Sequence, residues 1–136
     1  MHDPFEGTWK LNPVKSQFDA NHQPREGTMR LQVGTDGSIL LTAEGRNNKG
    51  EPFAERPQKL IPDGQPRPIP EMPGLTSVAT RPDRNTIRGQ ALREDGSVAG
   101  EGTYVVSDDG RFLMATTAGF DSQLRRFELR TVWDRL

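Results

Sequence analysis

The stretch Pro4-Phe5-Glu6-Gly7-Thr8-Trp9-Lys10-Leu11 alternates between two kinds of side chain. Its odd-numbered positions hold Phe5, Gly7, Trp9 and Leu11, and its even-numbered positions from Glu6 to Lys10 are polar or charged. Successive side chains of a β-strand point to opposite faces, so this period of two predicts a strand with one buried and one solvated face.

The other end of the chain repeats the pattern. Phe127, Leu129, Thr131 and Trp133 share one side of a predicted strand, and Arg126, Glu128, Arg130 and Val132 share the other. A tryptophan therefore lies on the inward face at each end of the chain. If the first and last strands pair, as the closing of a barrel requires, the two indoles come together.

Short apolar or β-branched runs fill the sequence between these ends, separated by Asp-Gly, Asn and Gly punctuation that is typical of hairpins. We expect about nine strands, near Phe5–Leu11, Thr28–Val33, Ser38–Glu44, Pro52–Leu60, Leu75–Thr80, Asn85–Arg93, Val98–Val106, Arg111–Ala118 and Leu124–Trp133. The tight turns fall at Asp36-Gly37, Asp95-Gly96 and Asp109-Gly110, where positive φ is tolerated. No apolar stripe has a helical period, so helix is limited to one short turn around Pro13–Phe18.

The segment Pro62–Gly74 breaks this rhythm with five of the 11 prolines. Proline has no backbone N–H, so we expect this segment to stay out of the sheet ladder and to cross the surface as an extended connection. Two interpretations remain open, a lid or rim over a site and a rigid crossover between two halves of the sheet.

Composition limits the function classes. At 136 residues we expect a single domain spanning 1–136, and a formal net charge of −1 without a basic cluster argues against a nucleic-acid partner. Cysteine is absent, and no apolar run is long enough for a membrane span. We expect a soluble, cytoplasmic protein, or a periplasmic or secreted one if a leader has been removed.

Residues 7–11, Gly-Thr-Trp-Lys-Leu, resemble the first strand of the calycin superfamily of lipocalins and fatty-acid-binding proteins. Together with 12–18, Asp95–Thr103 and Val105–Gly110, they are similar to bacterial lipocalin-like domains of largely unassigned function. The resemblance implies an all-β fold, an antiparallel up-and-down β-barrel of about 8–10 strands with little helix, around a cavity for small apolar molecules. It also implies that a basic residue of the last strand, Arg130 or Arg135, packs over Trp9.

The sequence departs from the fatty-acid-binding branch in two places. Only about sixteen residues, from Asn12 to Gly27, separate the first two strands, which leaves little room for that branch's helix pair. Its carboxylate-holding Arg-x-Tyr pair is replaced by Thr131 and Trp133 in an ungapped alignment of the last seven residues, so fatty-acid binding by that chemistry is not expected.

We therefore expect a small hydrophobic ligand in the barrel, whose wall includes Trp9, Met29, Leu31, Phe127 and Trp133, with polar contacts from Thr131 and Tyr104. Parity with Val98 and Val106 turns Tyr104 inward, where its phenol donates to a ligand carbonyl or, as is more expected, it is a core or wall residue with its hydroxyl at the rim. Two alternatives stay open, an enzyme of the same architecture (isomerase, lyase or hydrolase) and a structural or interaction domain with a filled barrel.

The remaining chemistry-bearing residues give weaker signals. His2 and His22 lie outside the predicted strands, and the pairing of His22 with Asp19 at a rim is less expected than a solvated loop histidine. No catalytic constellation, metal spacing or cofactor motif is recognised, so we expect no cofactor and no metal.

For two further pairs of residues, the interpretation depends on which face of the strand is inward. Arg88 and Gln90 lie outside if the Ile87-Gly89-Ala91 face is the cavity wall, and a slip of one residue would place them inside as the polar anchor of the ligand. Because the run from Arg111 to Ala115 is apolar on both faces, an outward patch at Phe112 and Met114 is either a homodimer interface or scattered surface apolar residues.

Overall fold

The computed structural model describes residues 3–17, 24–47, 49–54, 57–69, 72–120 and 125–136. His2, Asp19 and His22, considered above, lie outside these residues. The described part forms an 11-stranded sheet in which every pairing between named strands is antiparallel, and it contains no helix. This confirms the expected all-β, up-and-down architecture.

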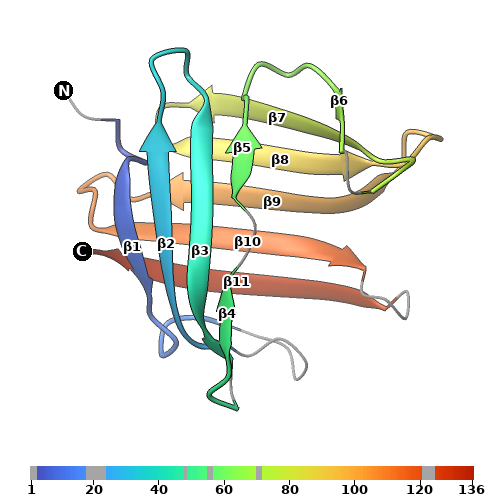
Figure 1. Ribbon diagram of the computed structural model, residues 1–136. Coiled ribbons are helices and arrows are strands. Elements are labelled where there is room, and N and C mark those ends of the chain that lie inside the picture. Colours follow the sequence, from blue (N-terminus) through green and yellow to red (C-terminus); the bar gives the residue numbers. More distant parts are fainter. Residues whose placement is uncertain (1–2, 18–23, 48, 55–56, 70–71, 121–124) are drawn as a thin grey trace.

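The strands follow the chain around a curled sheet (Figure 1). They are β1 (Gly7–Leu11), β2 (Pro24–Val33), β3 (Ile39–Asn47), β4 (Pro52–Ala54), β5 (Gln58–Leu60), β6 (Arg67–Pro68), β7 (Thr76–Asp83), β8 (Thr86–Leu92), β9 (Val98–Val106), β10 (Phe112–Phe120) and β11 (Arg126–Arg135). Their order in the sheet is β4-β3-β2-β1-β11-β10-β9-β8-β7-β6, and β5 also pairs with β3. The expected strand Pro52–Leu60 is therefore two short strands, β4 and β5.

The two ends of the chain lie side by side, as the alternation predicted. β1 pairs with β11 in a register that sets Trp9 opposite Arg135 and Leu11 opposite Trp133. The two indoles thus occupy diagonal positions on one face. After β1 the chain stays beside β11, because the amide of Gln17 donates to the carbonyl of Arg130 at 2.7 Å and the amide of Arg130 donates back at 3.0 Å.

The residues between β1 and this bridge form a turn and no helix. The hydroxyl of Ser16 accepts a hydrogen bond from the amide of Val132 at 2.8 Å, which fixes the turn to β11. The short helical turn expected around Pro13–Phe18 is therefore absent from the described residues of that segment, because the chain satisfies its backbone groups on the neighbouring strand.

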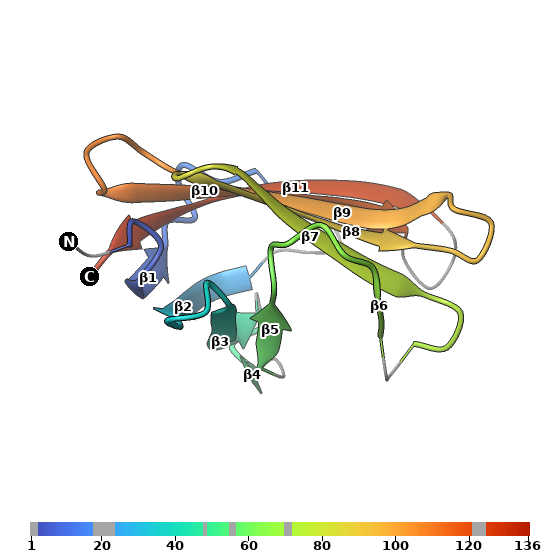
Figure 2. The ribbon, with the colours of Figure 1, turned by 90° about the horizontal axis from the view of Figure 1, so that it is seen from above.

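β1 to β3 cross β8 to β11 at a steep angle, so the sheet folds into two layers joined through β1 and β11 (Figures 1 and 2). The ends of β8 to β11 that lie far from β1 extend past the layer of β1 to β3 (Figure 1). A packed core fills the other end, with Phe5, Trp9, Ile39 and Leu113 each 0% exposed.

The predicted Asp-Gly turns are confirmed. Gly37, Gly96 and Gly110 have φ of 84°, 85° and 74°, conformations that glycine adopts without a steric penalty. In the first turn the Asp36 carboxylate accepts hydrogen bonds from the amide and hydroxyl of Ser38 at 3.0 and 2.6 Å. These hydrogen bonds lower the pKa of Asp36, and equivalent serine hydrogen bonds lower the pKa values of Asp95 and Asp109.

The proline-rich segment does join the sheet, which corrects the prediction that it cannot. β6 pairs with β7, and the amide of Gly64 donates to the carbonyl of Ala79 at 2.8 Å. An edge strand bonds on one side only, so prolines at alternate positions leave the required N–H groups free. We call residues 58–68 the strap, because β5 pairs with β3 at its start and β6 pairs with β7 at its end.

Candidate functional site

The inner face of the sheet follows from the register, because residues directly opposite one another in an antiparallel pair share a face. At the packed end a row of inward residues crosses four strands, namely Leu11, Trp133, Leu113 and Val106. The next row towards the other end is Thr131, Ala115, Tyr104 and Ile87. Leu113, Val106 and Ile87 are at most 2% exposed, so these two rows form the floor of the inner face.

The following two rows are built from much smaller residues. The first is Ala79, Gly89, Gly102, Thr117 and Leu129, and the second is Ser77, Ala91, Gly100, Gly119 and Phe127. All of these residues except Ala79 are half-buried although they lie on the inner face. We call these two rows the inner-face site.

Local geometry shows how glycines make room there. A Cβ atom added at Gly89 would meet no atom within 4 Å, so the inner surface of β8 faces open space at this point. At Gly119 an added Cβ would lie 3.4 Å from Cζ of Phe127, so the Phe127 ring lies against the bare backbone of β10. The site therefore has a wall of backbone and small side chains with one aromatic ring against it.

Three of the residues expected in the ligand wall lie in the packed core. Trp9 is 0% exposed, and Met29 and Leu31 are each 3% exposed. The indole Nε1 of Trp9 donates to the carbonyl of Phe5 at 3.1 Å, which satisfies its polar group internally. These side chains support the floor and present little surface to a ligand in this structure.

The other four expected residues are half-buried and lie on the inner face. Trp133 packs against the core, and an added Cβ at Gly27 would lie 3.4 Å from its Cη2 atom. Its Nε1 donates to the hydroxyl of Thr131 at 2.9 Å, so Thr131 orients the indole. Tyr104 lies between Ile87 and Ala115 in the floor, next to the small-residue rows. Phe127 belongs to the inner-face site itself.

Tyr104 is inward as predicted, but of the two valines that the prediction used only Val106 shares its face. Val106 is inward and 1% exposed, but Val98 is 40% exposed and lies opposite the outward Leu92. The register shifts between Ala91 and Leu92, and such a β-bulge moves one residue to the other face. Arg88 is exposed and outward, as expected if Ile87, Gly89 and Ala91 form the wall.

Arg135 closes the floor. Its guanidinium lies 4.2 Å from the centroid of the Trp9 ring, which confirms the expected cation–π contact. It also donates to the carbonyls of Glu6 at 2.7 Å, Pro4 at 2.5 Å and Gly110 at 2.6 Å. Gly7 permits this arrangement, because it has φ of 141° and an added Cβ would lie 2.7 Å from Nη1 of Arg135.

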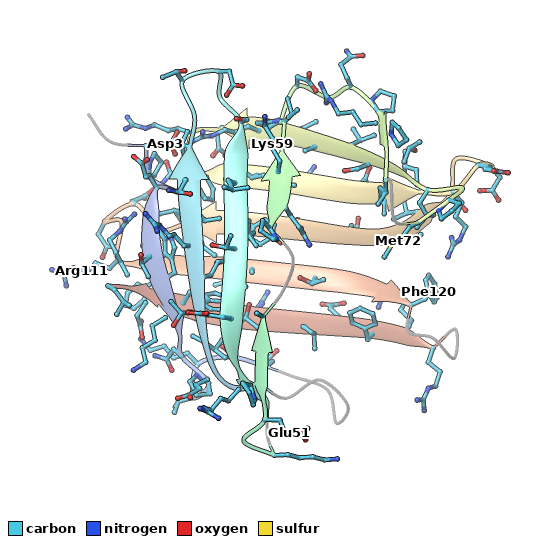
Figure 3. The ribbon with its side chains drawn as sticks, viewed as in Figure 1. Asp3, Glu51, Lys59, Met72, Arg111 and Phe120 are labelled. Carbon is cyan, nitrogen blue, oxygen red and sulfur yellow. The ribbon has the colours of Figure 1, made fainter. Side chains whose placement is uncertain are left out.

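Asp3, labelled in Figure 3, forms an ion pair at this end that the sequence reasoning missed. Arg81 of β7 donates to both carboxylate oxygens of Asp3 at 2.8 and 2.9 Å, and its guanidinium lies 5.1 Å from the Phe5 ring centroid. Burial raises the pKa of Asp3, but hydrogen bonds from Arg81 and the Phe5 amide, with the charge of Arg81, lower it by more. Its net pKa lies below the usual range. Asp3 and Arg81 are 78 residues apart, and no local pattern pairs them.

At the other end the strap places Arg67 opposite Ser77, on the face of the inner-face site. Its guanidinium donates to both oxygens of Asp63 at 2.8 and 2.7 Å, and this hydrogen bonding lowers the pKa of Asp63. The charge of Arg67 is thus already compensated by a carboxylate of the strap itself.

An open groove of about 660 Å³ lies on the outer face of β1 to β4 and is lined by Lys10, Thr28, Glu44 and Arg46, among others. The Nε atom of Arg46 lies 3.4 Å from Oε1 of Glu26, so charges of both signs surround the groove. Such a surface suits an apolar molecule less well than the inner face. Within the described residues, no three His, Cys, Asp or Glu side chains are grouped as metal ligands.

The described residues contain no helix that is long and apolar enough to cross a membrane. No protein-family model matches this sequence. The search of curated proteins also gave no match.

Solved structures do match, at low sequence identity. The fluorescent protein UnaG matches with a TM-score of 0.66 and 14% identity over 100% of both chains. Zebrafish ileal bile acid-binding protein, complexed with cholic acid, matches with a TM-score of 0.58 and 10% identity over 98% of this chain and 99% of that one. As-p18, an extracellular fatty acid binding protein, matches with a TM-score of 0.52 and 9% identity over 98% of this chain and 97% of that one. At these identities the matches show the fold alone.

Proposed function

We propose that this chain, which has the calycin fold of lipocalins and fatty-acid-binding proteins, binds a small hydrophobic molecule at the inner-face site. The observation that carries the proposal is the pair of inward rows in which every position except Leu129 and Phe127 holds glycine, alanine, serine or threonine. Gly89 has nothing within 4 Å of an added Cβ. Interiors are normally packed as densely as organic crystals, so inward positions this small leave room for another molecule.

The flanking side chains suit an apolar guest. Phe127 and Leu129 lie in the site, and Tyr104 and Trp133 lie on its floor side, all half-buried. A ligand that buries about 450 Å² of apolar surface gains about 11 kcal/mol at about 25 cal/mol per Å², and the loss of translational and rotational freedom costs at least about 4 kcal/mol. The remainder of about 7 kcal/mol corresponds to a dissociation constant in the micromolar range. Two structural neighbours are a bile acid-binding protein and a fatty acid binding protein, which supports this ligand class.

We further propose that the ligand is uncharged. Thr131 and Trp133 occupy the positions that the sequence comparison assigns to the carboxylate clamp, and the Thr131 hydroxyl already accepts the indole N–H. Arg67, on the face of the site, forms two hydrogen bonds with Asp63. An anionic ligand at this wall would lose its hydration without gaining an uncompensated cation.

The acid–base alternative has less support. The inward positions of the described strands that border the site carry the hydroxyls of Ser77, Tyr104, Thr117 and Thr131. A general acid or base that works near neutral pH is usually a carboxylate or imidazole with a shifted pKa. The carboxylates with lowered pKa values lie at the packed end, in the hairpin turns and in the strap.

Two matched fluorescent probes test the proposal. N-phenyl-1-naphthylamine is neutral, and 8-anilinonaphthalene-1-sulfonate carries the same ring system with a sulfonate. We expect the neutral probe to bind in the micromolar range, to quench or shift the emission of Trp133, and to bind at least about tenfold more tightly than the anion. If neither probe binds, the proposed binding function is overturned. Tighter binding of the sulfonate would overturn the neutral-ligand proposal and leave the site in place.

A variant that fills the inner-face site tests whether the probe binds there. Gly89→Leu puts a side chain into the space that the wild type leaves open, while Arg88→Leu adds similar apolar bulk on the outer face of the same strand. We expect Gly89→Leu to weaken probe binding by about tenfold or more, with the melting temperature retained. Arg88→Leu should bind as the wild type does. Equal binding by all three proteins would show that the inner-face site is not the binding site.

A further inference from the structure

On the outer face of β8 to β11, which faces away from the inner-face site, the side chains are also arranged in rows. These strands lie in one gently curved layer, and the remainder of the chain lies mainly on its inner side (Figure 2). Residues opposite one another in this layer again form rows. Their character changes in a regular sequence along the strands, from apolar to basic to acidic and back to apolar.

The two end rows carry exposed apolar side chains on β9 and β10, whereas on β11 the first row ends in the buried Val132 and the last row in the exposed Arg126. The first row consists of Thr86, Val105, Met114 and Val132. The last row contains the printed pairs Leu92 with Val98 and Phe120 with Arg126. Met114, Val105, Val98 and Phe120 are 41%, 40%, 40% and 45% exposed, which is high for large apolar side chains. Arg93 joins the two pairs of the last row, since it donates to the carbonyl of Val98 at 3.0 Å and lies 5.4 Å from the Phe120 ring centroid.

Charged rows lie between them. The basic row is Arg88, Thr103, Thr116 and Arg130, and the acidic row is Gln90, Glu101, Ala118 and Glu128. The arginines and glutamates are exposed, and the central threonines and Ala118 are small. The centre of this outer face therefore carries short side chains, and one half of the face is basic while the other half is acidic.

We propose that this face is the interface of a homodimer with two-fold symmetry. A two-fold axis parallel to the rows, between the basic and the acidic row, turns a second copy so that its acidic row lies over the basic row of the first. Arg130 then faces the partner's Glu128, and this contact occurs twice. The same rotation places Met114 over the partner's Phe120 and Val105 over the partner's Val98, so exposed apolar side chains meet on β9 and β10. Self-complementarity of this kind is what an isologous interface requires.

The alternative axis, parallel to the strands, is excluded by charge. It would place Arg88 over the partner's Arg130 and Glu101 near the partner's Glu128. Like charges facing each other across an interface are strongly unfavourable. The charge pattern thus selects one orientation, in which the strands of the two layers run nearly parallel or antiparallel, as in aligned sheet packing.

The area is sufficient for a weak dimer. Strands about 4.8 Å apart and a rise of about 3.4 Å per residue make the four rows roughly 25 Å by 18 Å. Two such faces bury on the order of 1,000 Å², near the lower limit of a specific interface, so we expect a dimer that dissociates on dilution. The intramolecular contact between Arg126 and Glu128 at 3.5 Å does not block the pairing, because their side chains are 61% and 58% exposed.

Charge exchange tests the proposal. Arg130→Glu puts a glutamate over the partner's Glu128, and Glu128→Arg puts an arginine over the partner's Arg130. We expect sedimentation equilibrium of the wild type, from about 10 μM to about 1 mM, to show a monomer–dimer equilibrium. Each single variant should weaken it by about tenfold or more. The double variant Arg130→Glu with Glu128→Arg should restore it, because each contact is then reversed and remains attractive.

The controls separate the interface from folding and from ligand binding. Arg30→Glu, exposed on the outer face of β2, should dimerise as the wild type does. Met114→Lys should weaken the dimer through the apolar row. All variants should bind the neutral probe unchanged, because their side chains face away from the inner-face site. A wild type that stays monomeric up to about 1 mM, or a double variant no better than the singles, would overturn the proposal.

Discussion

Arg135 connects segments from both ends of the chain. Its guanidinium stacks on Trp9 and hydrogen-bonds to carbonyls of Pro4, Glu6 and Gly110. Only a planar, multidentate cation makes the stacking contact and all three hydrogen bonds together. Gly7 leaves the space for it, so the Gly-x-Trp pattern of the first strand and the arginine of the last strand form one unit.

We expect Arg135→Lys to lower the free energy of unfolding by about 1–3 kcal/mol, because an ammonium group keeps the charge but not the fork of hydrogen bonds. Urea unfolding followed by tryptophan emission measures this loss. Arg130→Lys on the same strand is the matched control, since Arg130 points outward and should lose less than about 0.5 kcal/mol. Equal stabilities for the two variants would contradict the role given to Arg135.

Asp3 links the N-terminal segment to β7 through Arg81, and the pair predicts a pH dependence. Because its folded pKa lies below that of the unfolded chain, the ionised carboxylate stabilises the fold above about pH 4. The contribution is lost as the pH falls through the folded pKa. We expect Asp3→Asn to be less stable than the wild type at pH 7, and the difference to shrink at about pH 3.

Urea titrations of both proteins at the two pH values measure that change. Glu44→Gln, on the exposed outer face of β3, is the control and should match the wild type at neutral pH. A stability difference for Asp3→Asn that grows on acidification would have the wrong sign for this mechanism.

At the scale of single elements, glycines in strands have different roles. An added Cβ at Gly45 in β3 would clash with the backbone carbonyl of Glu26 in β2, close to the register shift between Pro24 and Glu26. Gly89 in β8 has open space instead. The first glycine allows two strands to approach closely, and the second leaves a space.

We expect Gly45→Ala to cost about 2–4 kcal/mol, because the neighbour in contact is backbone and cannot move aside cheaply. Gly89→Ala should be neutral or stabilising by a few tenths of a kcal/mol, since alanine restricts the unfolded chain and meets nothing in the strand. Thermal melts of both variants test the contrast. A larger loss at position 89 than at position 45 would refute it.

For the whole molecule, the described strands form one continuous sheet around one core, with β1 and β11 joined. That the chain folds as a single domain stays a prediction, and unfolding tests it. Trp9 lies in the core, and Trp133 packs against it from the last strand. Removal of either end of the chain would therefore expose the same core.

We expect cooperative unfolding, with tryptophan emission and far-ultraviolet circular dichroism giving coincident denaturant curves. In a Trp133→Phe variant the emission comes from Trp9 alone. The midpoint of its emission curve should coincide with the midpoint of its own circular dichroism curve. Two separated transitions would show that the chain is not one cooperative unit.

The all-β fold implied by the Gly-x-Trp strand and a few short stretches is confirmed by the structure and by its structural neighbours. Alternation along the chain correctly predicts the face of most strand residues and the pairing of the two chain ends, and the Asp-Gly pairs correctly predict the turns. These properties are local or follow from a period of two, so they can be read along the chain.

How deep each inward residue lies depends on the tertiary structure. Trp9, Met29 and Phe127 follow the same alternation, yet the first two are core and the third lies in the inner-face site. The alternation carries no information on where one layer of strands crosses the other, and that crossing determines which inward positions are covered. For the same reason the contact of Arg81 with Asp3, and the entry of Arg67–Pro68 into the ladder beside β7, depend on strand neighbours that no local pattern specifies.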